Sequence, residues 1–440
     1  MKNKKWMAIL LGGIMAASLA APCSVSAAEK TTLTFWHAMG GTNGEVLQQI
    51  VDDFNASQDE IEIKAEYQGT YDDTITKLKA AMQSDSGLPD VCQMYDVGTK
   101  FMYDSGAVIP VEDKFESTGY DKSSVMDVIS SYYTVDGKQY AMPFNVSTPM
   151  LYYNKDVFEA AGLDPETPPT TYDEVLEDAK KIVESGAAPV GYSQAIYGWF
   201  FEQQLAGLGV TYGNNDNGRT EAVTAVDFDS NGGGLKVFDM WKKLYDSGYF
   251  EDYGTTTADT QTAFFSGQVG MIIESTAILK NAVDSSPFEV GTGYLPRIEQ
   301  NDEGGVIIGG GSLWLTDTGN EANEDAAWKF IEYITTPDVQ AKWSMGTGYF
   351  AINEKAYETD DMKAYLEENP NFETAINQLK DSPVNCNTAG VLSGVQTEAR
   401  LTFNEIMPQV YDGKLTTQDA VDQLAASVNK AIENYNESIK

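Results

Sequence analysis

The order of apolar and polar residues along the chain predicts alternating strands and helices. Residues 31–37 alternate between the two classes and are rich in β-forming side chains, and a glycine-rich turn follows at 40–44. From Glu45 the apolar positions recur at helical spacing, and residues 61–67 form the next predicted strand. A strand, a turn, a helix and a strand in this order open an α/β unit, in which ligands bind beyond the carboxyl ends of the strands.

Two later segments repeat this pattern and end in polar side chains. A strand over 91–95 ends at Asp96, and a strand over 269–273 leads to Ser275 and Thr276 at the start of a helix. A carboxylate or hydroxyl in such a position commonly caps the following helix. The alternative is that the hydroxyls and free amides bind an anion and that Asp96 accepts hydrogen bonds from ligand hydroxyls.

The stretch 141–155 is predicted to cross between two lobes. Pro143 and Pro149 bracket a polar segment, and residues 150–153 have the apolar, aromatic content of a buried strand. Because proline disfavours helix in the residue before it, we expect residues 145–147 in irregular backbone, with amides and hydroxyls free to bind a ligand. An ordinary strand, loop and strand without a ligand is the alternative.

The first 28 residues have the pattern of a secretory signal peptide. A basic start precedes an apolar run over 8–21, and small residues follow at 25–28. The run is too short to span a bilayer as a helix, so we expect an exported protein that is periplasmic or at the cell surface. A lipid anchor at Cys23 is an open alternative, which is not favoured because Pro22 separates Cys23 from the preceding small residue.

Composition narrows the class of protein further. The chain has 440 residues, and removing 1–28 leaves 26 basic against 66 acidic residues, a formal charge of −40. This length favours two lobes over one core, and this charge argues against nucleic acid and anionic membranes as partners. Cys92 and Cys386 remain after cleavage, and one disulfide or two thiols are both open. His37 is the only histidine, so packing is its favoured role and we expect no metal and no cofactor.

Three further features have both a structural and a binding interpretation. Residues 191–201 hold five aromatics, which favours a core role, although Trp199 is able to present a flat face to a ligand. Three glycines at 309–311 indicate a bulge or a close approach to the backbone. Arg400 lies among acidic residues, and on this pattern alone a surface arginine paired with a glutamate is favoured.

The motifs together resemble a known family. They are similar to the extracellular solute-binding proteins of ABC transporters, in the sugar-binding superfamily, and most similar to the branch that binds glycerol-3-phosphate and glycerophosphodiesters. The likeness covers nearly the whole mature chain. It is carried by Phe35-Trp-His37, Tyr95-Asp-Val-Gly-Thr99, Pro143-Phe-Asn-Val-Ser-Thr-Pro149, Leu151-Tyr-Tyr-Asn-Lys-Asp156, Ala161-Gly-Leu-Asp-Pro165, Ile307-Ile-Gly-Gly310 and Thr347-Gly-Tyr349.

The resemblance implies an α/β fold of two lobes that are joined by a hinge and close on a ligand in the cleft between them. It implies lobe 1 over 29–140 plus 303–345, lobe 2 over 146–300 plus 349–440, and hinge crossovers at 141–145, 301–302 and 346–348. The implied protein is a monomeric receptor and not an enzyme. It delivers glycerol-3-phosphate or a glycerophosphodiester to a membrane permease with its ATPase.

The resemblance also implies the ligand residues. They are Tyr71, Asp96, Ser147, Ser275 or Thr276, Gly310, Tyr349 and Arg400, with Trp199 in the pocket wall. Arg400 and the hydroxyls suit a phosphate, and Asp96 and Tyr71 suit glycerol hydroxyls. Ile196 stands where some relatives have a second Trp, so glycerophosphocholine ranks level with glycerol-3-phosphate. An oligosaccharide receptor is the first alternative, and an exported hydrolase is the second.

Overall fold

The computed structural model of the chain describes residues 30–84 and 87–439. The predicted signal peptide over 1–28, with the candidate lipid anchor Cys23, lies outside the described residues. No helix among the described residues is long and apolar enough to cross a membrane. The described chain also holds no group of three or more His, Cys, Asp or Glu side chains that could bind a metal ion.

The first sheet contains the strands from the start of the chain. Its strands are β1 (Thr31–His37), β2 (Ile61–Tyr67), β3 (Val91–Tyr95), β4 (Val108–Ile109), β7 (Met142–Ser147) and β12 (Gly309–Thr316). Their order is β2-β1-β3-β12-β4, and β7 pairs with β12 beside this path. β1 is parallel to β2 and β3, whereas β12 is antiparallel to its partners. The carboxyl ends of β1 and β3 therefore meet at one edge, where Asp96 follows β3.

The second sheet lies in the other half of the molecule. Its strands are β8 (Pro149–Asn154), β9 (Val190–Ser193), β10 (Val269–Ser275) and β11 (Val290–Gly293), in the order β11-β8-β10-β9. β8 is antiparallel to β10 and β11, and β9 is parallel to β10. A short hairpin of β5 (Thr134–Val135) and β6 (Lys138–Gln139) stands apart from both sheets.

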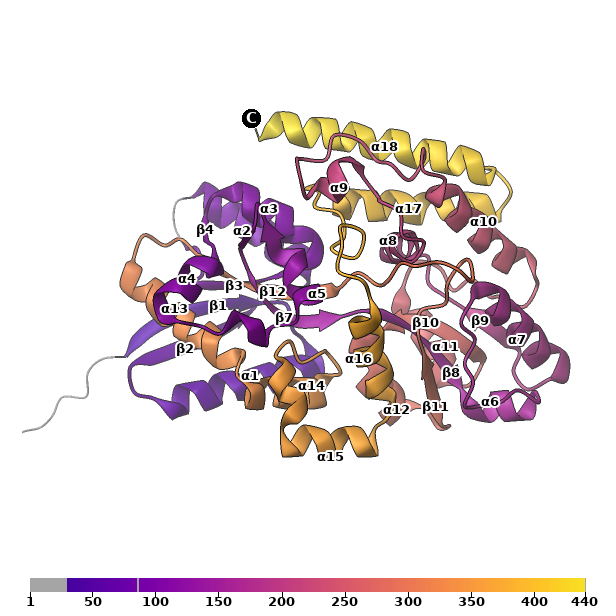
Figure 1. Cartoon of the computed structure of the whole chain (residues 1–440), viewed down its shortest axis with the longest axis horizontal. Helices are drawn as coiled ribbons and strands as arrows, with labels where there is room; N and C mark the ends of the chain where they lie inside the picture. Colours follow the sequence, from indigo (N-terminus) through magenta and orange to yellow (C-terminus); the bar gives the residue numbers. More distant parts are fainter. Residues whose placement is uncertain (1–29, 85–86, 440) are drawn as a thin grey trace, which may run out of the picture.

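Helices surround both sheets (Figure 1). Around the first sheet lie α1 (Gly41–Ser57), α2 (Tyr71–Gln83), α3 (Thr99–Ser105), α4 (Val111–Thr118), α5 (Asp127–Ser130), α13 (Glu321–Ile334) and α14 (Pro337–Thr347). Around the second lie α6 (Lys155–Ala160), α7 (Tyr172–Ser185), α8 (Gly198–Gly207), α9 (Asn214–Gly218), α10 (Gly233–Asp246), α11 (Thr257–Phe265), α12 (Leu279–Ser285), α16 (Asn371–Asp381), α17 (Gln396–Tyr411) and α18 (Thr417–Ser438). α15 (Asp360–Glu368) lies between α14 and α16 in the chain.

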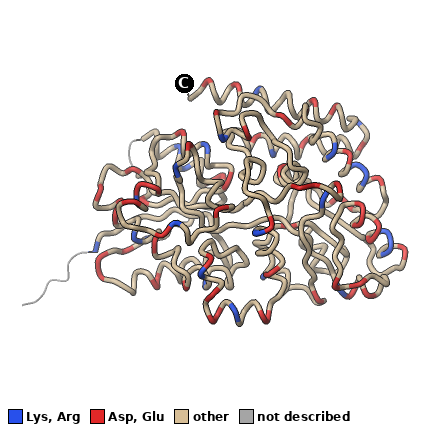
Figure 2. The backbone as a smooth tube through the Cα atoms, in the orientation of Figure 1, with Lys and Arg blue, Asp and Glu red and all other residues tan. Residues whose placement is uncertain are grey.

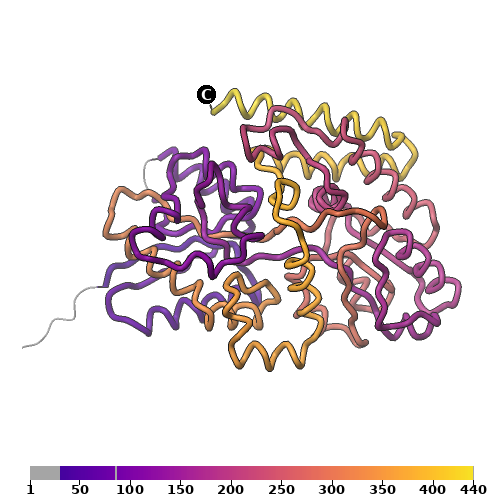
Figure 3. Tube along the Cα trace, in the orientation of Figure 1, coloured from indigo at the N-terminus to yellow at the C-terminus, as the bar shows by residue number. Residues whose placement is uncertain are grey.

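The chain passes between the two halves more than once (Figure 3). Only Thr148 separates β7 in the first sheet from β8 in the second. The chain returns over 294–308, between β11 and β12, and crosses again after α14. These crossings bring segments that are far apart in sequence to the junction between the sheets.

The expected irregular backbone at 145–147 was wrong. These residues belong to β7, which pairs with β12 from Gly309 to Leu313, and all six side chains of β7 are buried. The pairing tolerates Pro143 because β12 is the only strand that pairs with β7 at this residue among the described strands, and the register shifts between Gly311 and Ser312. The other edge of β7 is bonded at Val146, where the Phe350 N–H donates to the Val146 carbonyl at 2.9 Å. The predicted strands over 91–95 and 150–153 lie within β3 and β8.

The structure also answers the questions left by composition. Cys92 and Cys386 are both free thiols, so the disulfide alternative is excluded. His37 is buried, its Nδ1 accepts a hydrogen bond from the Met39 N–H at 3.3 Å, and burial lowers its pKa to about 4. His37 therefore has a packing role. Aspartates and glutamates are spread over both halves of the molecule (Figure 2).

Candidate functional site

A buried ion cluster joins the two halves of the molecule. Arg400, on α17, donates through Nε to Glu202 Oε1 and through Nη2 to Glu202 Oε2, each at 2.7 Å. The same Nη2 donates to Asp96 Oδ2 at 2.7 Å. All three side chains are less than a tenth exposed. Asp96 comes from the end of β3 in the first sheet, whereas Glu202 and Arg400 come from helices beside the second.

Close packing of α8 against α17 fixes the guanidinium. A Cβ at Gly198 would lie 2.5 Å from the Arg400 Cα, so only glycine allows this approach at the start of α8. Gly198 N–H donates to Asn404 Oδ1 at 2.9 Å, and Gln396 Nε2 donates to Glu202 Oε1 at 2.7 Å. Because Glu202 and Arg400 belong to the same half, their bidentate pair does not depend on the position of Asp96.

The cluster keeps Arg400 charged. Burial alone lowers the pKa of Arg400, but Asp96 and Glu202 outweigh burial and raise this pKa well above its usual range. Burial raises the pKa of Glu202, and the guanidinium opposes that shift. Glu274 on β10 is a further buried carboxyl whose pKa burial raises, and it accepts hydrogen bonds from Gln261 and from the Ser275 N–H. Acidic side chains therefore outnumber the one arginine in this region.

Tyrosines and amides from the first half lie beside the cluster. The Asn145 Nδ2 donates to the Tyr71 hydroxyl at 2.7 Å, and the Gln93 Nε2 donates to Asn145 Oδ1 at 2.7 Å. Tyr71 stacks on Tyr95 with ring centroids 5.0 Å apart and an interplanar angle of 6°. Burial raises the pKa of Tyr349, and hydrogen bonds with Asn145 and Tyr71 oppose that shift. Tyr71, Asn145 and Tyr349 thus form one polar group. Both tyrosine hydroxyls in it stay protonated at neutral pH.

Glycines of β12 allow an aromatic ring to approach the strand. A Cβ at Gly309 would lie 2.6 Å from Trp199 Cζ2, so the indole packs directly on this strand. Gly310 has φ +89°, and a Cβ there would lie 1.9 Å from the Asn145 carbonyl oxygen. The Trp199 Nε1 is buried and has no hydrogen-bond partner among the described residues. A donor of this kind is available to a ligand oxygen.

Two more contacts join the halves around this cluster. The Tyr95 hydroxyl lies 2.8 Å from Thr397 Oγ1 on α17. The Tyr435 hydroxyl of α18 donates to Asp104 Oδ2 on α3 at 2.7 Å. With the Asp96–Arg400 pair, these contacts hold the halves together over the buried side chains.

Comparison with known proteins identifies the family. Residues 49–374 match the family of bacterial extracellular solute-binding proteins. The chain belongs to this family. This solute-binding protein is 31% identical over 417 residues to the sn-glycerol-3-phosphate-binding periplasmic protein UgpB of Escherichia coli K12, a match that covers 93% of this chain and 94% of that protein.

Solved structures share the two-lobed fold of this solute-binding protein. The cyclic α-maltosyl-1,6-maltose binding protein of Arthrobacter globiformis superposes with a TM-score of 0.76 at 27% identity, over 92% of this chain and 100% of that one. UgpB of Mycobacterium tuberculosis, solved in complex with glycerophosphocholine, gives a TM-score of 0.78 at 20% identity, over 93% and 100% of the chains. The predicted α/β fold of two lobes, with a cleft between them, is confirmed.

The structure brings some of the predicted ligand residues of this solute-binding protein together. Asp96 and Arg400 are in direct contact, and Tyr71 and Tyr349 share Asn145. Arg400 is not a surface residue paired with a nearby glutamate on its own helix, because it is 8% exposed and its partners lie 198 and 304 positions away. The Asp96 carboxylate accepts from Arg400, and among the described residues no helix N–H donates to it.

Two of the three predicted hydroxyls, those of Ser275 and Thr276, already make structural hydrogen bonds. Ser275 Oγ accepts from the Ala277 N–H at 3.1 Å and so caps the turn that follows β10. Thr276 Oγ1 accepts from the Thr148 N–H at 3.2 Å, which ties it to the crossover. Ser147 is buried next to Thr148 and makes no side-chain hydrogen bond to another described residue. Among the described residues, no hydrogen bond joins these hydroxyls to Arg400, and their ligand role stays a prediction.

Sequence reasoning missed Glu202, the main partner of Arg400. The sequence does contain a signal for it, because Glu202 is the single charged residue in the otherwise apolar and amide-rich helix α8. A charge in a helix that is buried on every side needs a partner. The sequence alone gave no means of choosing Arg400 as that partner, since the two residues are far apart in the chain.

Proposed function

We propose that this protein captures a glycerophosphodiester or glycerol-3-phosphate between its lobes and delivers it to the permease of an ABC importer. The family consists of bacterial extracellular solute-binding proteins. We therefore also propose that the protein binds its ligand without transforming it. We also propose the lobe boundaries that the sequence predicts, 29–140 plus 303–345 and 146–300 plus 349–440, with one change. β7 (Met142–Ser147) belongs to the first sheet, so the first crossover lies at Thr148. Arg400 is the observation that carries the proposal.

A buried arginine at a junction between lobes suits an anion. Its guanidinium is held from one side by Glu202, so its geometry is fixed before a ligand arrives. The remaining contact, to Asp96, crosses between the lobes and breaks when they separate. A ligand phosphate would then take the position of the Asp96 carboxylate on Nη2, and Asp96 would turn to the ligand hydroxyls.

Charge in the site favours a diester over a monoester. Asp96, Glu202 and Arg400 together carry one net negative charge, and Glu274 adds a further buried carboxyl. A phosphodiester carries one negative charge, whereas a phosphate monoester carries about 1.5 to 2 at neutral pH. The diester therefore adds less repulsion. A quaternary ammonium on the same ligand would pack against aromatic rings such as Tyr197 and Trp199, whose centroids are 6.1 Å apart.

Calorimetry with three ligands tests the proposal. Mature protein stripped of ligand is titrated with glycerophosphocholine, glycerol-3-phosphate and maltose. We expect both phosphate compounds to bind and glycerophosphocholine to bind more tightly, because it adds less negative charge and contributes a cation. Binding of maltose without binding of either phosphate compound would contradict the proposal.

An oligosaccharide ligand is the second candidate. Two observations favour it: the Arthrobacter protein, at 27% identity, binds a cyclic maltosaccharide, and Arg400 is already neutralised by carboxylates. Carboxylates and aromatic rings are the usual partners of sugar hydroxyls and sugar faces. In the same titration this candidate predicts a response to maltose and none to the phosphate compounds.

A further inference from the structure

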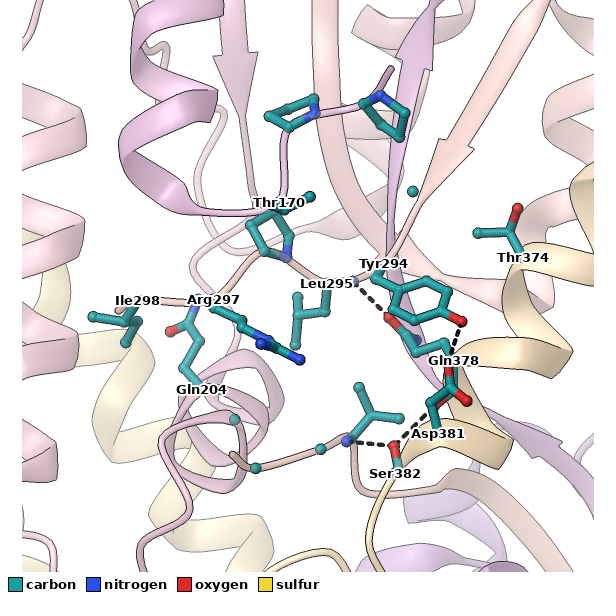
Figure 4. Close-up of a pocket in the computed structure, with 18 of the residues that line it drawn as sticks. Thr170, Gln204, Tyr294, Leu295, Arg297, Ile298, Thr374, Gln378, Asp381 and Ser382 are labelled. Carbon is teal, nitrogen blue, oxygen red and sulfur yellow. Dashed lines mark hydrogen bonds between the residues drawn. The ribbon is translucent and has the colours of Figure 1, made fainter. Parts of the chain in front are cut away.

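A cavity lies beside the second sheet, and Arg400 is not part of its lining. Its volume is about 540 Å³, which is within the range of small-molecule sites, about 300–1,000 Å³. Five segments line it: the loop before α7, the end of α8, the end of β11 with the residues that follow it, residues 304–306, and α16 (Figure 4). None of the residues proposed for the interlobe ligand belongs to its lining.

The walls of this cavity are largely apolar and stiff. Pro168, Pro169 and Pro296 form part of it, together with Leu295 and Val306. Proline rings have few conformations to lose when a ligand packs on them, so such a wall binds hydrocarbon at a low cost in entropy.

Most polar side chains in the lining are already satisfied. Gln204 donates to the Tyr172 hydroxyl at 2.7 Å and accepts from Trp241 Nε1 at 2.6 Å. Gln378 donates to the Pro149 carbonyl, and Ser382 accepts from the Val306 N–H at 3.1 Å. These groups hold the cavity open but have little capacity left for a ligand.

Arg297 is the charged exception, beside the neutral Gln300. Its backbone pairs with Thr170, but its side chain makes no hydrogen bond or ion pair with another described residue. Figure 4 shows the guanidinium extending toward the middle of the cavity. The acidic residue of the lining, Asp381, is exposed and accepts a hydrogen bond from the Tyr294 hydroxyl at 2.7 Å. An unpaired guanidinium beside an apolar wall matches an anion that carries a hydrocarbon group.

We propose that this cavity binds a small organic anion with a hydrocarbon part, such as a carboxylate or a sulfonate. The anionic group bonds to the Arg297 guanidinium, and the hydrocarbon part packs on the prolines and Leu295. This site is independent of the interlobe site, although α8 reaches both. The start of α8 carries Trp199 and Glu202, and the end of α8, at Gln204 and Gly207, lines the cavity.

The returning crossover forms one side of the site and is closely packed. The Gly304 N–H donates to the Gly207 carbonyl at 3.2 Å, and a Cβ at Gly304 would lie 1.9 Å from the Ala206 carbonyl oxygen. The cavity therefore has a fixed backbone wall on this side, which gives a ligand a defined fit.

Fluorescence titration with 1-anilinonaphthalene-8-sulfonate tests this site, because the probe combines a sulfonate with apolar rings. Full mature protein is titrated with the probe, and octanoate is then added as a competitor. We expect saturable binding that octanoate reverses. Arg297→Gln should weaken the binding of both compounds about tenfold, the effect of losing one hydrogen bond to a charged group. Arg297→Lys should weaken their binding less.

Two controls separate this site from other effects. Lys236→Gln removes a nearby exposed cation, paired with Glu299 at 2.7 Å and absent from the lining, and should leave the affinity unchanged. Saturating glycerophosphocholine should not displace the probe. Equal affinity of Arg297→Gln and wild type, displacement by glycerophosphocholine, or no saturable binding of the probe would each overturn the proposal. Because the Arg297 side chain is exposed, the variant should fold normally, which circular dichroism checks.

Discussion

Two arginines of this protein lie in opposite surroundings. Arg400 is buried, and two carboxylates from different lobes hold its guanidinium. Arg297 is exposed, and its guanidinium makes no hydrogen bond or ion pair with another described residue, although its charge acts on the nearby Asp302. The same side chain therefore has two uses. Where carboxylates fix it, the arginine stabilises the fold and has a set orientation, and a ligand must replace one carboxylate to reach it. Where no carboxylate holds it, we expect the arginine to be open to an anion, for which water competes.

The largest expected difference between the two arginines is in stability. Arg400→Ala leaves Glu202 and Asp96 buried without a cation, which should lower the free energy of unfolding by about 3–5 kcal/mol. Arg297→Ala removes an exposed, unpaired side chain and should change it by less than about 0.5 kcal/mol. Urea unfolding followed by circular dichroism measures both.

A charge-retaining variant refines this prediction. Arg400→Lys keeps a cation beside Glu202 but loses the bidentate geometry, so its stability should lie between that of wild type and that of Arg400→Ala. Equal unfolding free energies for Arg400→Ala and Arg297→Ala would show that the buried cluster contributes no more to stability than the exposed residue.

A smaller effect is expected at Asp96, the part of the cluster that crosses between lobes. Asp96→Asn removes a charged hydrogen-bond acceptor and should lower the free energy of unfolding by about 1–2 kcal/mol. The ligand-free protein should also open, because the Arg400 contact between the lobes is weakened. Small-angle X-ray scattering should then give a larger radius of gyration than wild type.

The matched control for Asp96 is the carboxylate of the other cavity. Asp381 is exposed and bonds to Tyr294 within the same half of the molecule. Asp381→Asn should therefore change neither the free energy of unfolding nor the radius of gyration. An unchanged radius of gyration for Asp96→Asn would mean that other contacts, such as Tyr95 with Thr397, are sufficient to keep the lobes together.

Local patterns predicted much of the fold. The strand over 61–67 has the predicted bounds, because alternation of apolar residues reports which side chains face the core. Chain length and the pattern at 141–155 predicted two lobes, and the motif resemblance correctly predicted that they form the solute-binding fold. The strand at 145–147 was missed because its polar residues become buried only when β12 pairs with it, and that partner lies about 165 positions later in the chain.

The candidate site was only partly predictable. Asp96 and Arg400 were chosen from the motif resemblance, and the structure places them 2.7 Å apart. The sequence did not predict Glu202 as the partner of Arg400, nor the hydrogen bond from Asn145 to the Tyr71 hydroxyl. Pairings between residues that are distant in sequence depend on the whole fold. Residue types alone indicate that a buried charge needs a partner but not which residue supplies it.

The most direct test of the central claim is calorimetry of glycerophosphocholine binding to wild type, Arg400→Gln and Arg297→Gln. If Arg400 binds the phosphate through charged hydrogen bonds worth about 1.5–3 kcal/mol each, Arg400→Gln should weaken binding at least about 100-fold. Arg297→Gln should bind as wild type does, since Arg297 lies in the other cavity. Binding by Arg400→Gln that equals wild-type binding would contradict the account, because the buried arginine would then serve the fold alone.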